Sequence, residues 1–320
     1  MKRCVRIILF GIVATVFALL QLPLAAAGTP AHGAVYVGVA NGEHTVYRVE
    51  YDYDGANSFT VSAPVLLATL PGAAGYAILP DRSLLVCGQG AMSKVDLATG
   101  SFVTASPGNN CNTVALDPDR TTAWVGWKDT ALSAVPLQPF GDGSTHAVSG
   151  DDAVATHIAF APNGMVFYDT GGEFELGNVG VIDLSTFTTT RLFTATEATS
   201  IEYDAFSDSI IFAAFGKAHQ IDPDNATVIV SSRDDSAAGE NYLALIPDGK
   251  GHLLATRWGG DAALVLIDYS ATGLLGDAST RMLSAPIPGL TGLAGGLAWD
   301  NPVIFTDGFD GAGTTAQAQP

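Results

Sequence analysis

Apolar and polar positions along the chain follow a pattern that recurs roughly every forty residues. The stretch "THIAFAPNGMVFYDTG" (156–171) joins two short apolar runs through a Pro-Asn-Gly turn, in which Pro presets φ and Gly tolerates positive φ. Similar phrases are "GYAILPDRSLLVCGQG" (75–90), "NTVALDPDRTTAWVGW" (112–127), "TSIEYDAFSDSIIFAAFG" (199–216) and "NYLALIPDGKGHLLATRWG" (241–259). Each copy predicts two strands joined by a tight turn, and the absence of long 3.6-residue apolar periods predicts few helices.

Two further strands follow each of these pairs. A third apolar run ends in an acid-bearing turn, as in "SKVDLATG" (93–100) and "GVIDLSTF" (180–187), and a more polar fourth run follows, as in "FTTTRLFT" (187–194). Four short strands in a repeat of roughly 40–45 residues are typical of one blade of a β-propeller.

The two ends of the repeat array complement each other. First strands are predicted at Tyr76, Thr113, His157, Ile201, Tyr242 and 296–298. The strand at 296–298 has no blade after it, whereas the segment 34–55 has later strands and lacks a first one. We therefore predict an all-β, six-bladed β-propeller over residues 28–302, in which the C-terminal strand completes the first blade and removes the free edges.

The repeated I-A-x-x-P-D-G phrase resembles that of the six-bladed propellers of the NHL-repeat and SMP-30/gluconolactonase-like group, over nearly the whole mature chain. SMP-30 lactonases hold one divalent cation in the channel through a Glu, an Asn and an Asp from different blades. This resemblance implies a metal-dependent lactone hydrolase, with calcium as the expected cation. Its implied metal ligands are Asn112, Glu240 and Asn241, with Glu202 as a catalytic candidate; the first-blade Glu position instead holds Gly295 and Gly296.

The N-terminal residues 1–27 have the features of a secretory signal peptide. Lys2, Arg3 and Arg6 precede an apolar run, and Ala25 and Ala27 frame a small-residue cleavage site before Gly28. The apolar run is short for a transmembrane anchor, so we expect cleavage and a secreted or periplasmic protein with no membrane span in its mature chain. Residues 303–320 are predicted to form a C-terminal tail.

Charge narrows the choice of partners. The chain has 14 basic and 32 acidic residues, and removing residues 1–27 leaves 11 basic residues and a net charge of −21. Such a surface repels nucleic acids and anionic membranes, and it favours a soluble monomer. Cys87 and Cys111 remain in the mature chain, and in an oxidising compartment they form either a disulfide or two separate buried thiols.

The mouth of the propeller channel is the predicted ligand site. Loops before first strands and after second strands converge there, bringing together Trp127, His157, Tyr242, Arg257 and Trp258. Aromatic faces and polar groups around one opening suit a sugar or another small polar molecule, so the leading hypothesis is a binding module for such a ligand or for an extracellular protein. An alternative is a lyase or hydrolase with His157 as general base, although a channel histidine can also be purely structural.

Overall fold

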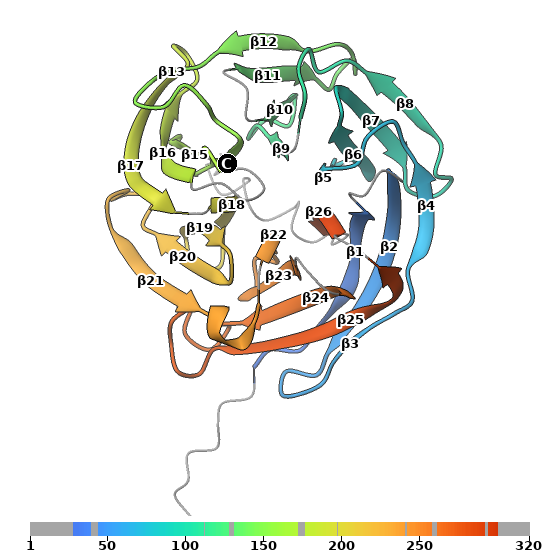
Figure 1. Cartoon of the computed structure of the whole chain (residues 1–320), viewed down its shortest axis with the longest axis vertical. Helices are drawn as coiled ribbons and strands as arrows, with labels where there is room; N and C mark the ends of the chain where they lie inside the picture. Colours follow the sequence, from blue (N-terminus) through green and yellow to red (C-terminus); the bar gives the residue numbers. More distant parts are fainter. Residues whose placement is uncertain are drawn as a thin grey trace, which may run out of the picture.

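Six β-sheets surround a central axis as the blades of a propeller (Figure 1). The computed structural model describes residues 28–39, 44–111, 113–127, 131–171, 177–196, 198–240, 242–257, 261–291 and 294–299. These residues contain one short 3-10 turn, η1 (Ser236–Ala238), and no α-helix. No helix in this part of the chain is long and apolar enough to span a bilayer. The all-β, six-bladed fold is thus confirmed, while the predicted signal peptide and C-terminal tail lie outside the described residues.

Each blade has its first strand nearest the axis, and the later strands follow outward (Figure 1). Blade 1 consists of β26 (Ala294–Trp299), β1 (Ala31–Val39), β2 (Thr45–Tyr53), β3 (Phe59–Val61) and β4 (Val65–Thr69). Blade 2 consists of β5 (Gly75–Ile78), β6 (Ser83–Gly88), β7 (Ala91–Asp96) and β8 (Phe102–Ala105). Blade 3 consists of β9 (Thr113–Leu116), β10 (Thr122–Gly126), β11 (Ala131–Pro136) and β12 (Ser144–Ala147).

The second half of the ring repeats this arrangement. Blade 4 consists of β14 (His157–Phe160), β15 (Val166–Asp169), β16 (Gly177–Asp183), β17 (Thr188–Thr196) and a short parallel strand at its outer edge, β13 (Ser149–Gly150). Blade 5 consists of β18 (Ala198–Asp204), β19 (Ser209–Ala214), β20 (Lys217–Ile221) and β21 (Ile229–Asp234). Blade 6 consists of β22 (Tyr242–Pro247), β23 (His252–Arg257), β24 (Asp261–Asp268) and β25 (Arg281–Thr291).

The ring closes through the two ends of the chain. Strand β26 pairs antiparallel with β1, with Val35 opposite Trp299 and Val37 opposite Leu297. This confirms that a C-terminal strand completes the N-terminal blade. Strand β2 alternates towards its end, where Tyr51 and Tyr53 are buried while Asp52 is exposed. Residues 51 and 53 thus face blade 6, whereas Val46, on the other face of β2, packs against blade 2.

The turn between the first and second strands owes its shape to the Pro-Asp/Asn-Gly sequence. In blade 4, the Ala161 and Met165 backbones pair across the turn, Gly164 adopts φ 86°, and the Asn163 side chain accepts a hydrogen bond from the Met165 amide. These are the roles expected of Asn and Gly at positions that favour local side-chain bonding and positive φ.

The hydrophobic core lies between the blades. Each of the six buried clusters combines side chains of two neighbouring blades, and one of them packs Val35 and Val49 of blade 1 against Leu254 and Leu264 of blade 6. Both faces of a blade are therefore buried. The fold is stabilised by apolar burial all round the ring, and the loops at its ends remain available for other roles.

A disulfide joins Cys87 in β6 to Cys111, which precedes β9 in the next blade. The two Cα atoms lie 5.8 Å apart, and both side chains are buried among residues of blades 2 and 3. Of the two alternatives left open by the sequence, the structure thus supports the disulfide. Such a bond is typical of proteins that fold in an oxidising compartment.

Candidate functional site

One end of the ring collects the loops that precede first strands and those that connect second to third strands. This follows from the antiparallel order of each sheet, which brings the start of the innermost strand and the end of its neighbour to the same edge. We call this end the mouth. In blade 4, for example, His157 at the start of β14 lies directly opposite Asp169 at the end of β15.

His157 and Asp169 form a hydrogen-bonded pair at the mouth. His157 Nδ1 lies 2.7 Å from Asp169 Oδ1, and the imidazole side chain keeps 13% exposure whereas the carboxylate is fully buried. Asp169 Oδ1 also accepts the Gly171 amide, but Oδ2 has no hydrogen-bond partner in the described part of the chain. Burial raises the pKa of Asp169, although its bonds to His157 oppose that shift. The pair fixes one ring nitrogen and leaves Nε2 for a ligand.

Arg257 and Glu240 form a second pair at the mouth, in blade 6. Arg257 ends β23, and its Nη1 lies 3.5 Å from Glu240 Oε1; the two side chains are 28% and 7% exposed. Arg257 Nε and Glu240 Oε2 are both buried without a hydrogen-bond partner among the described residues. This pair therefore leaves one donor and one acceptor unused.

Tyr242 has a different environment from the one expected of a mouth residue. It is 1% exposed, packs between blades 5 and 6, and donates its hydroxyl hydrogen to Asp235 Oδ2 at the end of the outer strand β21. The register explains this position, because the first residue of β22 faces blade 5 together with Leu245. The Tyr242 hydroxyl therefore links blade 6 to blade 5 through Asp235.

Glu202 lies on the innermost strand β18 and points toward the neighbouring blade. It lies opposite Ile211 on β19, which packs into the cluster between blades 5 and 6. Two other residues on the same face of β18 also contact blade 6: Ser200 bonds to Leu245, and Asp204 accepts a bond from Tyr269. Burial raises the pKa of Glu202 to about 8. Glu202 is therefore largely protonated at neutral pH, unlike a typical cation ligand.

Buried polar atoms without a hydrogen-bond partner gather at the mouth. In the part of the chain that the structure describes, they include Thr45 Oγ1, Tyr76 Oη, Thr156 Oγ1, Asp169 Oδ2, Glu240 Oε2 and Arg257 Nε. Each atom belongs to a residue at the mouth end of a blade. These residues lie at the start of a first or third strand, at the end of a second strand, or just before a first strand. Trp127, which directly follows β10, is partly exposed at the same end.

The sequence predictions for the mouth are thus only partly tested. Trp127, His157, Arg257 and Glu240 occupy mouth positions, whereas Asn112, Asn241 and Trp258 lie outside the described residues. Sequence reasoning assigned no role to Thr45 or Thr156, and it did not predict the bond between Asp169 and His157. The sequence signal for the contact of Asp169 was its place at the end of a second strand, opposite the His at the start of the first strand. Thr45 and Thr156 offered no such signal.

The implied metal site stays a prediction. Among the described residues, no group of three or more His, Cys, Asp or Glu side chains could hold a metal ion. Of the implied ligands, Glu240 has a guanidinium as its charge partner, and the two asparagines lie outside the described residues. A calcium site needs several oxygens converging on one point, and Glu240 is the one implied ligand within the described residues.

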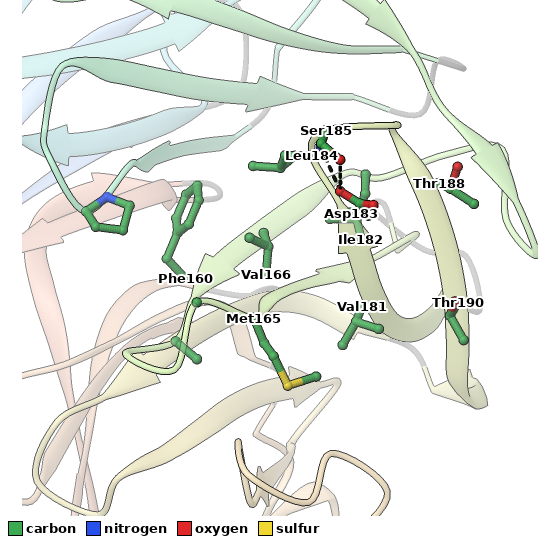
Figure 2. Close-up of a pocket in the computed structure, with 13 residues that line it drawn as sticks. Phe160, Met165, Val166, Val181, Ile182, Asp183, Leu184, Ser185, Thr188 and Thr190 are labelled. Carbon is green, nitrogen blue, oxygen red and sulfur yellow. Dashed lines mark hydrogen bonds between the residues drawn. The ribbon is translucent and has the colours of Figure 1, made fainter.

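A pocket of about 610 Å³ lies at the opposite end of the ring, around the turns of blade 4 (Figure 2). Phe160, Met165, Val166 and Val181 line it. Its carboxylate, Asp183, accepts hydrogen bonds from the Ser185 amide and hydroxyl, as the dashed lines in Figure 2 show. The unpartnered polar atoms named above belong to the mouth instead, so the mouth is the better candidate site.

Comparisons with known proteins bear on the fold. No family model matches the chain, and no curated protein matches it by sequence. Its structure is similar to that of a protein of unknown function from Bacteroides caccae, with a TM-score of 0.58 and 13% identity over 84% of this chain and 99% of that one. It is similar to regucalcin, described as a calcium-binding protein, from Agrobacterium tumefaciens, with a TM-score of 0.55 and 15% identity over 72% and 79% of the two chains.

A third similar structure is the PQQ-bound form of aldose sugar dehydrogenase from Streptomyces coelicolor, with a TM-score of 0.51 and 13% identity over 72% and 86% of the two chains. These likenesses support the propeller fold. At such identities they show a shared fold, and the fold alone does not fix an activity.

Proposed function

We propose that this chain is an exported β-propeller that binds a small, uncharged, polyhydroxylated molecule, such as a sugar, at the mouth. The observation that carries the proposal is the gathering of unpartnered buried polar atoms there. A buried donor or acceptor without a partner costs about 1–3 kcal/mol, so native proteins satisfy such groups with water or a ligand. The disulfide fits export, because such bonds persist in oxidising compartments.

The kinds of atom at the mouth favour hydroxyl groups as partners. Asp169 Oδ2 and Glu240 Oε2 are acceptors, Arg257 Nε is a donor, and the Thr156 hydroxyl can do both. A ligand hydroxyl can also donate and accept, so a polyol matches this mixture. An anion would meet two carboxylates, and a cation would meet the guanidinium of Arg257.

Trp127 would supply the apolar surface that a sugar ring needs. Its indole is partly exposed beside β10, and aromatic faces pack against the C–H side of flat polar molecules. The partly exposed side chains of Trp127, His157 and Arg257 come from blades 3, 4 and 6, so a ligand that contacts all three spans the channel.

Calorimetric titration of the mature protein with a neutral hexose, its aldonolactone and its aldonate tests this function. We expect the neutral molecules to bind and the aldonate anion to bind at least tenfold more weakly. Arg257→Gln should weaken hexose binding about tenfold, through the loss of a charged hydrogen-bond donor.

The matched control is Arg233→Gln. Arg233 also pairs with an acid, Asp235, but it lies on the outer strand β21 and should leave affinity within about twofold of the wild type. Binding that is equally affected by both variants, or that favours the aldonate, would contradict the proposal.

Proton transfer is a second candidate function, favoured by the bond between His157 and Asp169. With Nδ1–H donated to the carboxylate, the imidazole presents an unprotonated Nε2 that can accept a proton from a hydroxyl or an acidic C–H group. Asp169 is then a positioning residue, because it acts through His157.

Turnover of sugar lactones and acidic oligosaccharides, measured with and without a chelator, tests this second function. We expect turnover that survives chelation and is lost in His157→Asn. The control His146→Asn changes a histidine on the outer strand β12, which stacks on Phe187 at 4.3 Å and should leave turnover unchanged. Turnover lost on chelation but retained in His157→Asn would favour the metal-dependent lactonase instead.

A further inference from the structure

The outermost strands of the six blades differ in charge. Those of blades 4, 5 and 6 each contain an arginine, namely Arg191 in β17, Arg233 in β21 and Arg281 in β25. Strands β3, β4, β8 and β12, at the rim of blades 1, 2 and 3, contain no Asp, Glu, Lys or Arg. The rim of three consecutive blades is thus uncharged in a chain whose net charge is −18.

The charged part of the rim is also covered by other segments of the chain. In blade 4, the short strand β13 pairs with β17. In blade 5, the Gly276 amide donates to Ser231 Oγ on β21, and in blade 6, Arg281 Nη1 donates to the Gly55 carbonyl oxygen of the turn before β3. By contrast, the sheet of blade 2 ends at β8, and among the described strands β4 pairs with β2 alone. Such an edge has backbone groups that can pair with another strand.

Four exposed apolar residues on β4 and β8 form one patch, which we call the rim patch. Each of them is between 41% and 63% exposed. The two strands belong to neighbouring blades at the periphery of the ring (Figure 1). The turn before β8 lies against β4, because a Cβ atom on Gly100 would lie 2.3 Å from the Leu67 carbonyl oxygen. The members of the rim patch are Val65, Leu66, Phe102 and Val103.

Most charges that flank the rim patch are paired with each other. Arg48, on the strand beside β4, bonds to Glu50 at 2.7 Å. Lys94, on the strand beside β8, bonds to Asp81 at 2.6 Å. Asp96, at the end of β7, accepts amide hydrogens of the turn that leads to β8. Two of these three acids are therefore neutralised, which leaves little charge to repel another acidic surface.

We propose that the rim patch is the contact surface for a second copy of this chain, with β8 of the two copies paired antiparallel around a two-fold axis. A basic partner would be drawn to the acidic surfaces of the molecule instead, whereas a second acidic chain meets the least repulsion here. Two identical strands can pair in this way because a two-fold axis exchanges them. The net charge that favours a monomer acts most weakly at this surface. The patch lies on the side of the ring, so the pairing leaves the mouth of each copy open.

Sedimentation equilibrium of the mature protein tests the proposal. We expect a dimer that dissociates on dilution, with a dissociation constant below about 1 mM. Raising the salt concentration from about 0.05 M to about 0.5 M should strengthen the dimer, because salt screens the repulsion between two acidic copies. A protein that stays monomeric up to about 1 mM, or a dimer that weakens as salt is added, would overturn the proposal.

A matched pair of variants assigns the contact to β8. Val103→Lys should weaken the dimer at least about tenfold, because a lysine on an edge strand opposes pairing and its charge would have to be desolvated. The control is Val230→Lys on β21, the outermost strand of blade 5, where the valine is 45% exposed. This control should keep the dissociation constant within about twofold of the wild type. Equal weakening in both variants, or none in Val103→Lys, would contradict the assignment.

Hydrogen exchange locates the contact without any substitution. In the dimer, the backbone amides on the outer side of β8 gain hydrogen-bond partners. Residues 101–106 should therefore exchange at least about tenfold more slowly at a concentration that favours the dimer than after dilution, whereas residues 228–234 should exchange equally in both. A dimer with unchanged exchange at residues 101–106 would show that the copies meet elsewhere, and this result would overturn the proposal.

Discussion

Replacing Glu202 with Gln should stabilise the protein, and the gain should depend on pH. Glu202 makes no hydrogen bond or ion pair within the described part of the chain, and it shares its face with the fully buried Ile211. Burial raises its pKa from 4.5 to about 8, so the folded protein keeps a proton that the unfolded chain releases. Gln has the shape of the protonated acid and no charge to lose.

The sign and size of the effect follow from proton linkage. Because the folded state binds the additional proton, wild-type stability falls as pH rises from about 4.5 to about 8. Each unit of pH in this window removes at most about 1.4 kcal/mol. Glu202→Gln should thus match the wild type near pH 4.5 and exceed it by at most about 3.5 kcal/mol at pH 7. Partial solvent contact of the side chain reduces this value.

Urea unfolding at a series of pH values, followed by tryptophan fluorescence, measures the difference between variant and wild type. The control is Glu50→Gln, which removes an exposed acid paired with Arg48 and should change stability by less than about 1 kcal/mol at any pH. A difference for Glu202→Gln that does not grow with pH would refute the reasoning. A variant that is destabilised at pH 7 would indicate instead that Glu202 is ionised and held by a cation.

The disulfide, the network around Asp152 and the buried His252 give three further predictions. The double variant Cys87→Ala/Cys111→Ala should lose about 3 kcal/mol in urea unfolding, because the bond spans 24 residues, and thiol titration of the unreduced, denatured wild type should find no free thiol. Burial would raise the pKa of Asp152, but its bonds from Arg191 and two other side chains outweigh burial and lower it. The stability that Asp152 contributes is therefore lost as pH falls through that lowered pKa. Asp152→Asn should lower the free energy of unfolding by about 3–5 kcal/mol at pH 7. Urea unfolding at a series of pH values from acid to neutral measures both effects. Burial would lower the pKa of His252, but the hydrogen bond to Asp248 outweighs burial and raises the pKa above 6.5. The melting temperature should therefore fall as pH rises through the raised pKa. This fall should be smaller in His252→Gln.

The architecture could be predicted because it depends on short-range chemistry. Turn residues such as Pro162 and Gly164 set the spacing of strands, and the spacing set the number of blades. The strand at the C-terminal end was assigned to blade 1 by counting first strands, and its pairing with β1 confirms that assignment.

The candidate site was less predictable because both faces of each blade are buried. In a sheet with one solvent face, alternation tells which side chains point inward, but here Tyr242 and Glu202 both point between blades. Their direction depends on register, as does the contact between His157 and Asp169 across β14 and β15. The sequence places such residues near the mouth without showing which of them meet.

The position of β26 also has a consequence for the order of assembly. A ribosome makes β1 before the other five blades and β26 after them, so the inner edge of blade 1 stays unpaired until those blades have been made. The other five sheets can pair within consecutive stretches of sequence, but the ring cannot close before Trp299 has been added. Any chain that stops short of the last strand is left with an open ring, so completion of the fold itself distinguishes finished molecules from truncated ones.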